Sequence, residues 1–539
     1  TEERREYEMN LFGISFPNKI ENTDQLYFDI QHGHFNPSDH SLTKGTILGT
    51  NTYFNIFSLH QYLKYTTLEQ LILELSGNGA FHLKVIQQDI IHPENQTILY
   101  TDSCILSANH SFSIPICYQC DNKDSVLFFT LEALEDSCYF LGGFYKTEPA
   151  ILPSVCKLAM VICTYNREEY VYSNLKTIYS DIFDRPDSPI KDDLEIFIVD
   201  NGKSLQNQWG DHPQIHYYQN KNLGGSGGFT RGMLEVLQSQ TQFSHILLCD
   251  DDITLDADVL VKNIQFLKIQ KKEAKHIYLA GSMLYIDRPC TQHEAGAQWD
   301  GINYKPIPVK PLLELNHPED VLKNETEVSV DYAGWGYLCF PVSEINENNL
   351  PLPLFVKWDD TEFALRNHAQ CITLNGIGFW HPSYQSNYSP TLTYYDIRNS
   401  FVINACLGIP NHFKKRKLTK FFFANLVYGN LAMVKCILWA INDYLYGIRF
   451  FQTTDGQKNH QKLQNMLKAI QTIPKHTKKE KVFCSFKSLF SLNFWHYTFY
   501  WFRLVIQFVF THNKIDQQFK QQQLQICNIH FWKELLKED

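Results

Sequence analysis

The chain has 539 residues, of which 44% are hydrophobic and 20% charged, so it is too long for one ordinary core and too apolar to be mostly disordered. Its 14 cysteines follow no repeating spacing, which argues against a disulfide-rich secreted scaffold. The net charge of −10 is unevenly spread, because from Asn411 onward 20 Lys and Arg face 7 Asp and Glu, a balance of +13 against −23 for the preceding residues. A basic end on an acidic body favours a polyanionic partner, either anionic lipid or nucleic acid.

The first region, residues 1–150, is expected to form a β-sandwich domain. Residues 71–75 and 81–85 alternate apolar and polar side chains around Ser-Gly-Asn-Gly-Ala, a pattern typical of a hairpin. Residues 125–134 and 138–145 add further short apolar runs that are bounded by polar turns. The pattern leaves open whether such a domain binds carbohydrate or serves as a scaffold.

The second region, residues 151–400, alternates strands with helices and predicts an α/β domain. Residues 158–163, 194–199 and 245–249 are short apolar runs of the kind that are buried on both faces in a parallel sheet. Polar residues follow each run at once. Because ligands of open α/β sheets bind at the carboxyl ends of the strands, these three strand ends are expected to form one site.

The strongest chemical signal is the triplet Asp250, Asp251 and Asp252 at the end of a buried strand. Three neighbouring carboxylates repel one another unless a cation neutralises them. Hard oxygen ligands select Mg²⁺ or Mn²⁺, ions that commonly bridge phosphate oxygens. The alternative is a solvated acidic loop, which the preceding apolar run makes less favourable.

Three other segments allow both a functional and a structural interpretation. The glycine-rich residues 222–231 open a helix, where glycines either let a ligand approach the backbone or form a mobile turn. The segment Trp358–Phe363 contains Asp359 and Asp360, which either supply a general base or begin a helix. His381 either binds a metal or has a structural role.

The third region, residues 401–539, is expected to be helical, aromatic and basic. Residues 414–417 are Lys-Lys-Arg-Lys, and residues 494–502 form an aromatic cluster. Basic residues beside exposed aromatic rings suit the surface of an anionic membrane, although a helical bundle with a solvated basic face is the alternative. No run of 18 uncharged apolar residues occurs and residues 1–10 lack the apolar core of a signal peptide, so a peripheral location on the inner face of the cytoplasmic membrane is expected.

Six motifs, taken in their order along the chain, resemble those of a known family. They are Val161–Arg167, Asp200–Gly202, Asn222–Gly228, Asp250–Asp252, Trp358–Phe363 and Trp380–His381. In this order they resemble glycosyltransferase family 2 with its GT-A fold, and within it the galactofuranosyltransferases of the type that polymerises cell-wall galactan. The resemblance implies a multidomain α/β protein with an N-terminal β-sandwich, a central Rossmann-like GT-A domain and a C-terminal helical region.

The resemblance also implies an inverting transfer from a UDP-sugar, with UDP-galactofuranose as the implied donor, to a hydroxyl of a glycan or lipid-linked glycan. The residues implied for nucleotide and donor sugar are Arg167, Asp200, Asn222, Asp250, Asp251 and Glu294. The implied ligands of Mn²⁺ or Mg²⁺ are Asp250, Asp252 and His381. The implied general base is Asp360, with Asp359 beside it, and the implied acceptor contacts are Trp335, Trp358 and Tyr384.

Other functions remain open at this point. A family 2 transferase with another donor, such as a rhamnosyltransferase that uses dTDP-rhamnose, shares the same motifs. A nucleotidyltransferase normally has a glycine-rich basic loop directly after the first strand, where this chain has Thr164-Tyr-Asn-Arg167. A non-catalytic glycan-binding protein would leave the acids at the strand ends unexplained. Relatives form oligomers, so a homo-oligomer is expected, whereas no motif for reading nucleic acid is recognisable.

Overall fold

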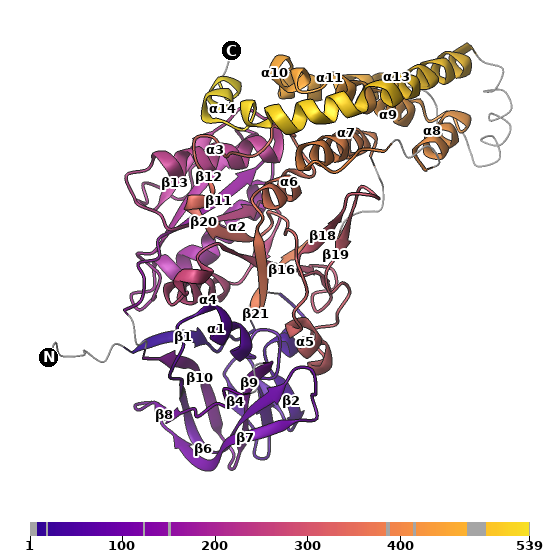
Figure 1. The fold of residues 1–539 in the computed structure, drawn as a ribbon. Coiled ribbons are helices and arrows are strands. Elements are labelled where there is room, and N and C mark those ends of the chain that lie inside the picture. The colour runs from indigo at the N-terminus through magenta and orange to yellow at the C-terminus, as the bar shows by residue number, and fades with distance from the viewer. Residues whose placement is uncertain are drawn as a thin grey trace.

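The computed structural model describes residues 8–17, 20–121, 124–148, 152–383, 389–412, 417–471 and 492–537. Figure 1 shows a β-rich region at the N-terminal end, an α/β region in the middle and a layer of long helices at the C-terminal end. The predicted α/β class with a helical C-terminal region is confirmed. The domain boundaries near residues 150 and 400 stay predictions.

The strands of the first region form one ten-stranded sheet in the order β2-β5-β9-β6-β10-β4-β3, with β1 on β10 and with β7 and β8 on β6. Short helix α1 (Leu59–Tyr65) packs on this sheet. The strands are β1 (Met9–Gly13), β2 (Asp29–His32), β3 (Phe35–Asn36), β4 (Ser41–Leu42), β5 (Ile47–Gly49), β6 (Ile72–Asp89), β7 (Gln96–Leu106), β8 (Phe112–Pro115), β9 (Ser125–Ala133) and β10 (Cys138–Thr147).

The predicted hairpin within residues 71–85 is wrong, because β6 runs through the expected turn as one strand. Its first half pairs with β8 and β10 and its second half with β7 and β9, so β6 is shared by the two halves of the sheet. The glycines permit this course. A Cβ on Gly77 would lie 2.4 Å from the Tyr139 carbonyl oxygen, and Gly79 has a φ of 111°. Glycine inside a strand can mark a close approach of strands as well as a turn. The predicted β-sandwich stays a prediction.

The α/β region is built on a nine-stranded sheet in the order β13-β12-β11-β14-β20-β16-β21-β15, with β17 on β16, and a separate pair β18-β19. Its strands are β11 (Leu158–Thr164), β12 (Leu194–Asp200), β13 (Ile215–Gln219), β14 (His245–Asp250), β15 (Thr254–Leu255), β16 (Ile277–Tyr285), β17 (Gln292–Glu294), β18 (Ala297–Asp300), β19 (Lys305–Pro308), β20 (Leu338–Pro341) and β21 (Gln370–His381). Its helices are α2 (Glu168–Ile178), α3 (Gly224–Gln238), α4 (Ala257–Lys268), α5 (Pro318–Glu325) and α6 (Asp359–Arg366).

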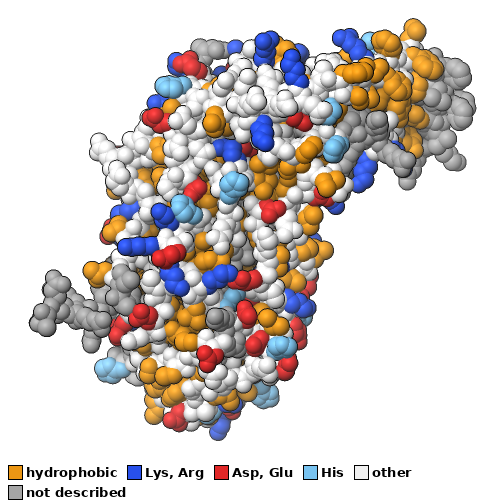
Figure 2. Space-filling model, viewed as in Figure 1, with side chains coloured by type: hydrophobic (Ala, Val, Ile, Leu, Met, Phe, Trp, Pro, Cys, Tyr) orange, Lys and Arg blue, Asp and Glu red, His pale blue; other side chains and the backbone are white. Residues whose placement is uncertain are grey.

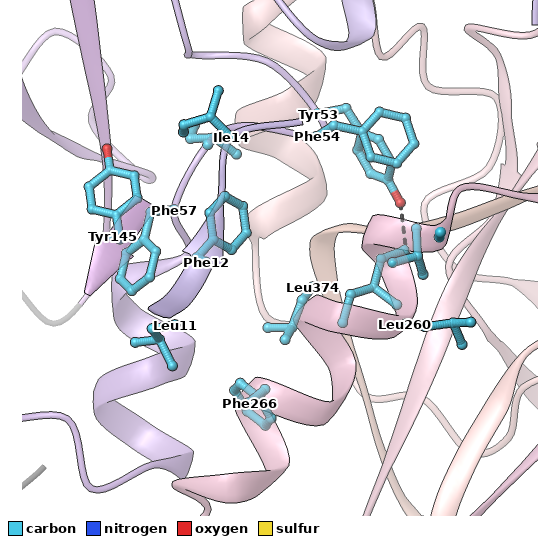
Figure 3. Packing of buried hydrophobic residues seen from close by; sticks show 14 of the residues in the cluster. Leu11, Phe12, Ile14, Tyr53, Phe54, Phe57, Tyr145, Leu260, Phe266 and Leu374 are labelled. Atoms are coloured by element: carbon cyan, nitrogen blue, oxygen red, sulfur yellow. Dashed lines mark hydrogen bonds between the residues drawn. The ribbon is translucent and has the colours of Figure 1, made fainter. Parts of the chain in front are cut away.

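The first two regions share one hydrophobic core. Figure 3 shows Phe12 and Phe57 of the first region in the same cluster as Phe266 and Leu374 of the second. Lys262 on α4 is buried in this contact and donates hydrogen bonds to the Phe54 carbonyl oxygen at 2.6 Å and to Ser15 Oγ at 2.9 Å. Burial lowers the pKa of Lys262 to about 8. The N-terminal region is therefore fixed against the α/β region rather than tethered to it.

The C-terminal helices pack on one another around a second core, in which α7 contacts α9 and α13. The helices are α7 (Pro390–Leu407), α8 (Lys417–Val427), α9 (Leu431–Leu445), α10 (Arg449–Thr453), α11 (Gly456–Gln471), α13 (Leu492–Gln522) and α14 (Ile529–Leu535). Trp532 on α14 returns to the α/β region, where its Nε1 donates to the Pro351 carbonyl oxygen at 2.9 Å. Of the helices described, none combines the length and the apolar character that crossing a bilayer requires.

Candidate active site

The carboxyl ends of three parallel strands meet at one edge of the central sheet, as the sequence predicts. Strand β11 lies between β12 and β14, with Thr164 paired to Asp200 and Cys163 paired to Asp250. The polar residues that follow these strands are therefore neighbours. The backbone N–H of Tyr165, just after β11, donates to Oδ2 of Asp251 at 3.0 Å.

His381 reaches the acidic triplet through the pairing of two distant strands. Strand β15 follows the triplet directly and pairs antiparallel with the end of β21, so that Thr254 lies opposite Trp380. His381 is the next residue along β21, and its Nε2 lies 3.2 Å from Oδ1 of Asp252. Asp252 and His381 are 129 positions apart in the chain, and the register between β15 and β21 brings them together.

The three acids differ in their electrostatic surroundings. Burial, followed by the charges of Asp252 and Asp251, raises the pKa of Asp250 to about 7. Burial also raises the pKa of Asp251. Burial acts in the same direction on Asp252, but the hydrogen bond and charge of His381, together with the charge of Arg167, outweigh it and lower the pKa of Asp252. Nη1 of Arg167 lies 2.5 Å from Oδ2 of Asp252.

The chemistry of the Asp252–His381 pair fits two ligands of a divalent cation. Nδ1 of His381 donates to the Pro382 carbonyl oxygen at 2.6 Å, an arrangement typical of histidines that bind metal through Nε2. Because Nδ1 carries the proton donated to Pro382, Nε2 faces the Asp252 carboxylate with a lone pair. Either a proton on Nε2 or a cation bound by both Nε2 and the carboxylate makes this contact favourable. Within the described ranges no group of three or more His, Cys, Asp or Glu side chains is arranged to hold a metal. The three-ligand set that includes Asp250 stays a prediction.

The second pair of predicted acids begins helix α6, after a strained turn. Phe355, Lys357 and Trp358 all have φ between 68° and 75°, a conformation that non-glycine residues rarely adopt. After this turn Asp359 is buried and Asp360 is half-buried. The N–H and Oγ1 of Thr361 donate to Oδ1 of Asp360 at 2.6 and 3.1 Å.

Two glycine-containing segments bring the acids into one site. A Cβ on Gly225, in the first turn of α3, would lie 3.7 Å from Oδ2 of Asp359. In residues 333–336, a Cβ on Gly334 would lie 3.8 Å from Oδ2 of Asp360, and one on Gly336 would lie 3.8 Å from Oδ2 of Asp250. The short segment 333–336 therefore lies between Asp360 on one side and Asp250 on the other.

Glu294, at the end of β17, joins this group of acids. Burial, followed by the charge of Asp360, raises the pKa of Glu294 to about 7. Acids whose pKa values are shifted by burial and by one another are typical of functional sites. The sequence reached Glu294 only through the family resemblance, because no local pattern marks it.

The residues predicted to contact the nucleotide have structural partners as well. Asp200 is fully buried, and its carboxylate accepts from the N–H groups of Gly202 and Leu205 at 2.9 Å and from the Tyr217 hydroxyl at 3.0 Å. Its carboxylate thereby shapes the turn after β12. Asn222 accepts from the Gly224 N–H at 3.0 Å through Oδ1 and lies at the rim of a cavity described below. Nucleotide contacts by Asp200 and Asn222 stay predictions.

The predicted acceptor aromatics have different environments. Trp335 is only 4% exposed and packs edge-to-face against Phe229 and Phe363, at ring centroid distances of 5.1 and 6.2 Å. The ring is therefore largely buried against these two side chains, and its predicted contact with an acceptor stays a prediction. Trp358 is half-buried, and its ring lies 5.2 Å from that of Trp299. Tyr384 lies outside the described residues.

Sequence reasoning missed three residues that shape this site. Trp299 on β18 pairs with Trp358, and Lys357 lowers the pKa of Asp360 through its charge, although burial has the larger, opposite effect. Asn399 on α7 donates through Nδ2 to the carbonyl oxygens of Val356 and Lys357, both at 2.9 Å, and so holds the strained turn. None of these carries a local sequence signal, except that Lys357 directly precedes a recognised motif.

Comparisons with known proteins agree with this geometry. Residues 159–300 match the family Glycosyl transferase family 2. The chain is 25% identical over 390 residues to Galactofuranosyltransferase GlfT2 of Mycobacterium tuberculosis and 26% identical over 397 residues to that of Mycolicibacterium smegmatis. Each match covers 66% of this chain and 57% of the relative, so the chain spans somewhat more than half the length of these curated relatives.

Similarity to solved structures is weak. The mannosyltransferase PcManGT from Pyrobaculum calidifontis, in complex with GDP-Man and Mn²⁺, is 10% identical, with a TM-score of 0.32 over 67% of this chain and 89% of that one. This score is too low to support a conclusion about fold or function. The family match, by contrast, spans β11 to β18 and contains Arg167, Asp200, Asn222 and the acidic triplet. The chain therefore carries a glycosyl transferase family 2 domain and is related to the galactofuranosyltransferases.

Proposed function

We propose that the protein is an inverting glycosyltransferase that moves galactofuranose from UDP-galactofuranose to a hydroxyl of a cell-surface glycan or glycolipid. The relatives named above support the donor class. The observation that carries the proposal is that Asp252 and His381 meet at the strand ends while the Asp360 charge acts on Asp250 and Glu294. This arrangement supports the proposal, because Asp250, a proposed metal ligand, and Asp360, the proposed general base, both approach one segment, residues 333–336.

Asp360 is the proposed general base. Its Oδ1 is occupied by the two hydrogen bonds from Thr361, while Oδ2 points toward Gly334, where no side chain intervenes. Oδ2 takes the proton of the acceptor hydroxyl as the hydroxyl oxygen bonds to the anomeric carbon and the bond to the diphosphate oxygen breaks. Attack from the face opposite the diphosphate inverts the configuration, and no covalent bond to the protein forms.

The negatively charged diphosphate of the donor requires positively charged groups around it. Arg167, at the edge of the acidic triplet, is the guanidinium proposed to bind the phosphate oxygens. Asp252 and His381, together with Asp250, would hold Mn²⁺ or Mg²⁺, which would neutralise the charge on the departing diphosphate. The raised pKa of Asp250 fits this role, because a nearby cation favours the ionised form that burial disfavours.

The substitution Asp360→Asn tests the proposal directly. We expect transfer to fall by about a hundredfold or more, the usual contribution of a general base, while the dissociation constant for UDP measured by calorimetry changes little. Asp211→Asn, which removes an exposed carboxylate that precedes the amino end of β13, is the matched control and should retain activity. Undiminished turnover of Asp360→Asn would remove Asp360 from this role.

A donor-hydrolysis screen identifies the sugar. UDP-galactofuranose, UDP-galactose and dTDP-rhamnose are incubated with the full chain, each with Mn²⁺, with Mg²⁺ and with EDTA. We expect UDP-galactofuranose to be consumed fastest, with activity lost in EDTA and restored by either cation. Preference for dTDP-rhamnose would assign another family 2 donor, and full activity in EDTA would contradict the metal.

We also propose an anionic membrane surface as a partner of the C-terminal helices. Exposed apolar side chains recur along one face of α13 at intervals of three or four residues, namely Trp495, Phe499, Phe502, Ile506 and Val509. Figure 2 shows hydrophobic side chains gathered toward the far end of the helical layer. The basic balance of residues 411–539 complements anionic lipid. Residues 414–416 of the predicted basic cluster lie outside the described residues.

A further inference from the structure

A cavity of about 480 Å³ lies between the carboxyl ends of β11 to β13 and helix α11 of the C-terminal region. The sheet side contributes Asn201, Lys203 and Asn220, and α11 contributes Gln457, Lys458 and Gln461. The walls thus combine amide groups with lysine ammonium groups, drawn from segments more than 200 residues apart in the chain. The sequence predicted donor contacts only from the sheet side.

Helix α11 is a fixed wall of this cavity. Lys221, which follows β13, forms an ion pair with Asp455 at 2.7 Å, and Oδ1 of Asp455 accepts from the N–H of Lys458 at 2.9 Å. A Cβ on Gly456 would lie 3.5 Å from both Leu223 and Phe355. The start of α11 therefore packs directly on the glycine-rich start of α3 and on the strained turn before α6.

His460 strengthens the same contact one helical turn later. Its ring stacks on that of Phe355 with a centroid distance of 4.6 Å, and its Nδ1 lies 3.0 Å from the Tyr395 hydroxyl. The cavity wall is thereby attached to the segment that presents Asp359 and Asp360. A ligand in the cavity would touch elements that also position the proposed general base.

The cavity lies next to the acidic triplet. Tyr165 lines the cavity, and its backbone N–H binds Asp251, so one short segment after β11 separates the two. The strand order β13-β12-β11-β14 places the triplet over β14 and the cavity over the other three strands. A donor whose diphosphate lies at the triplet therefore extends its nucleoside into the cavity.

One buried polar atom in the cavity wall requires a partner. Asn220 is 1% exposed, and its Nδ2 donates to Oδ1 of Asn201 at 2.8 Å. Its own Oδ1 has no hydrogen-bond partner among the described residues. A buried acceptor without a donor is unfavourable, which marks this part of the wall as polar and not fully satisfied by the protein alone.

On the basis of the function proposed above, we infer that α11 completes the nucleoside-binding pocket of the donor site. Gln457 and Lys458 on the helix face Asn201, Lys203 and Asn220 on the sheet, and together they bind the nucleoside of the donor. Nucleotide affinity then depends on the C-terminal helical region as well as on the family 2 domain. Each amide or ammonium contact is expected to account for about a fivefold change in affinity, the usual size for one hydrogen bond.

Calorimetric titration of the full chain with UDP tests this inference. We expect Lys458→Ala and Gln457→Ala each to bind UDP about fivefold more weakly than wild type, and the double variant more weakly still. The matched control is Lys468→Ala, which removes the same charge from an exposed position of α11 outside the cavity and should leave UDP affinity unchanged. Melting temperatures of all variants show whether α11 remains folded.

Two negative results are distinguishable. If wild type binds UDP and the Lys458→Ala and Gln457→Ala variants bind it as tightly as Lys468→Ala does, the role of α11 is refuted while the proposed transferase stands. If wild type binds neither UDP nor dTDP nor GDP, the donor assignment fails and the inference fails with it. Weaker UDP binding in the cavity variants at unchanged melting temperature supports both the role of α11 and the assignment of the donor.

Discussion

Asp359 and Asp360 lie where the protein opposes their ionisation. Burial, followed by the charge of Asp360, raises the pKa of Asp359 well above its ordinary value. Burial also raises the pKa of Asp360, whereas the hydrogen bonds from Thr361 and the charge of Lys357 act in the opposite direction. A general base has to be ionised at the working pH, so these opposing contributions decide the pH range in which Asp360 can accept a proton.

Lys357→Met is expected to move the acidic limb of the pH profile to higher pH. Removal of the ammonium group leaves burial less opposed, so the pKa of Asp360 rises further. The quantity to measure is kcat/KM between pH 5 and 9, where activity is lost as pH falls through the pKa of the base. Lys357→Arg retains the charge and should keep the wild-type limb. A Lys357→Met profile that superimposes on the wild-type profile would contradict this account.

At the scale of elements, the glycine-rich start of α3 is explained largely by packing. Gly224 has a φ of 71°, and a Cβ there would lie 1.9 Å from the Phe355 carbonyl oxygen. A Cβ on Gly228 would lie 2.1 Å from Sγ of Cys163, and one on Gly232 would lie 2.2 Å from Cγ1 of Val161. These glycines let α3 lie directly against β11 and the turn before α6. Gly225 differs, because it faces Asp359 in the site.

Two alanine substitutions distinguish the glycines of α3 that are needed for packing from the glycine that faces the site. Gly228→Ala is expected to destabilise the protein by about 1–3 kcal/mol, because the new methyl group overlaps Cys163 and Asn201 on the buried edge of the sheet. Gly225→Ala places a methyl group at an ordinary contact distance of 3.7 Å from Asp359 and should leave the melting temperature unchanged. Thermal unfolding of both variants is the measurement, and equal melting temperatures would show that α3 does not pack as described.

The sequence predicted those parts of the site that lie at the ends of strongly apolar strands. β11, β12 and β14 were recognisable because buried parallel strands are short apolar runs, and the parallel arrangement then places Asp200 and Asp250 at one edge. The error at β6 arose because glycine serves both turns and close strand contacts. The burial of Trp335 could not be predicted, because an aromatic residue between glycines suits a core as well as a ligand site.

The remaining parts of the site depend on contacts between distant segments. The sequence pattern left open whether His381 binds a metal or has a structural role, and the family resemblance favoured the metal. Its place beside the triplet follows from the pairing of β15 with β21. Helix α11 belongs to a region whose sequence indicates only that it is helical, aromatic and basic, and Asn399 on α7 lies at the end of the predicted α/β region, outside any motif. No local pattern tells which face of such a helix meets a cavity 200 residues away, because tertiary packing decides it.

At the scale of the whole molecule, the positive charge balance and the exposed apolar face of one long helix lie at the same end. The helical layer that carries the positive balance also carries the exposed face of α13, at the opposite end of the molecule from the N-terminal sheet (Figure 1). The strand ends of the central sheet share a cavity with helix α11 of this layer, so a membrane at that end would lie on the same side of the sheet as the site. Such an orientation suits an enzyme whose acceptor is anchored in the lipid surface.

Vesicle sedimentation tests this orientation. We expect the protein to bind vesicles that contain phosphatidylglycerol more tightly than vesicles of phosphatidylcholine alone, and to lose much of that difference at high salt, because salt screens the basic helices. Trp495→Ser combined with Phe499→Ser should weaken binding by about tenfold or more, since each buried aromatic side chain contributes about 1.5–3 kcal/mol. Ile98→Ser combined with Ile105→Ser removes two exposed apolar side chains from β7 at the other end and should leave binding unchanged. If the wild-type protein stays in the supernatant with anionic vesicles, or if both double variants behave alike, the exposed face of α13 does not bind membranes.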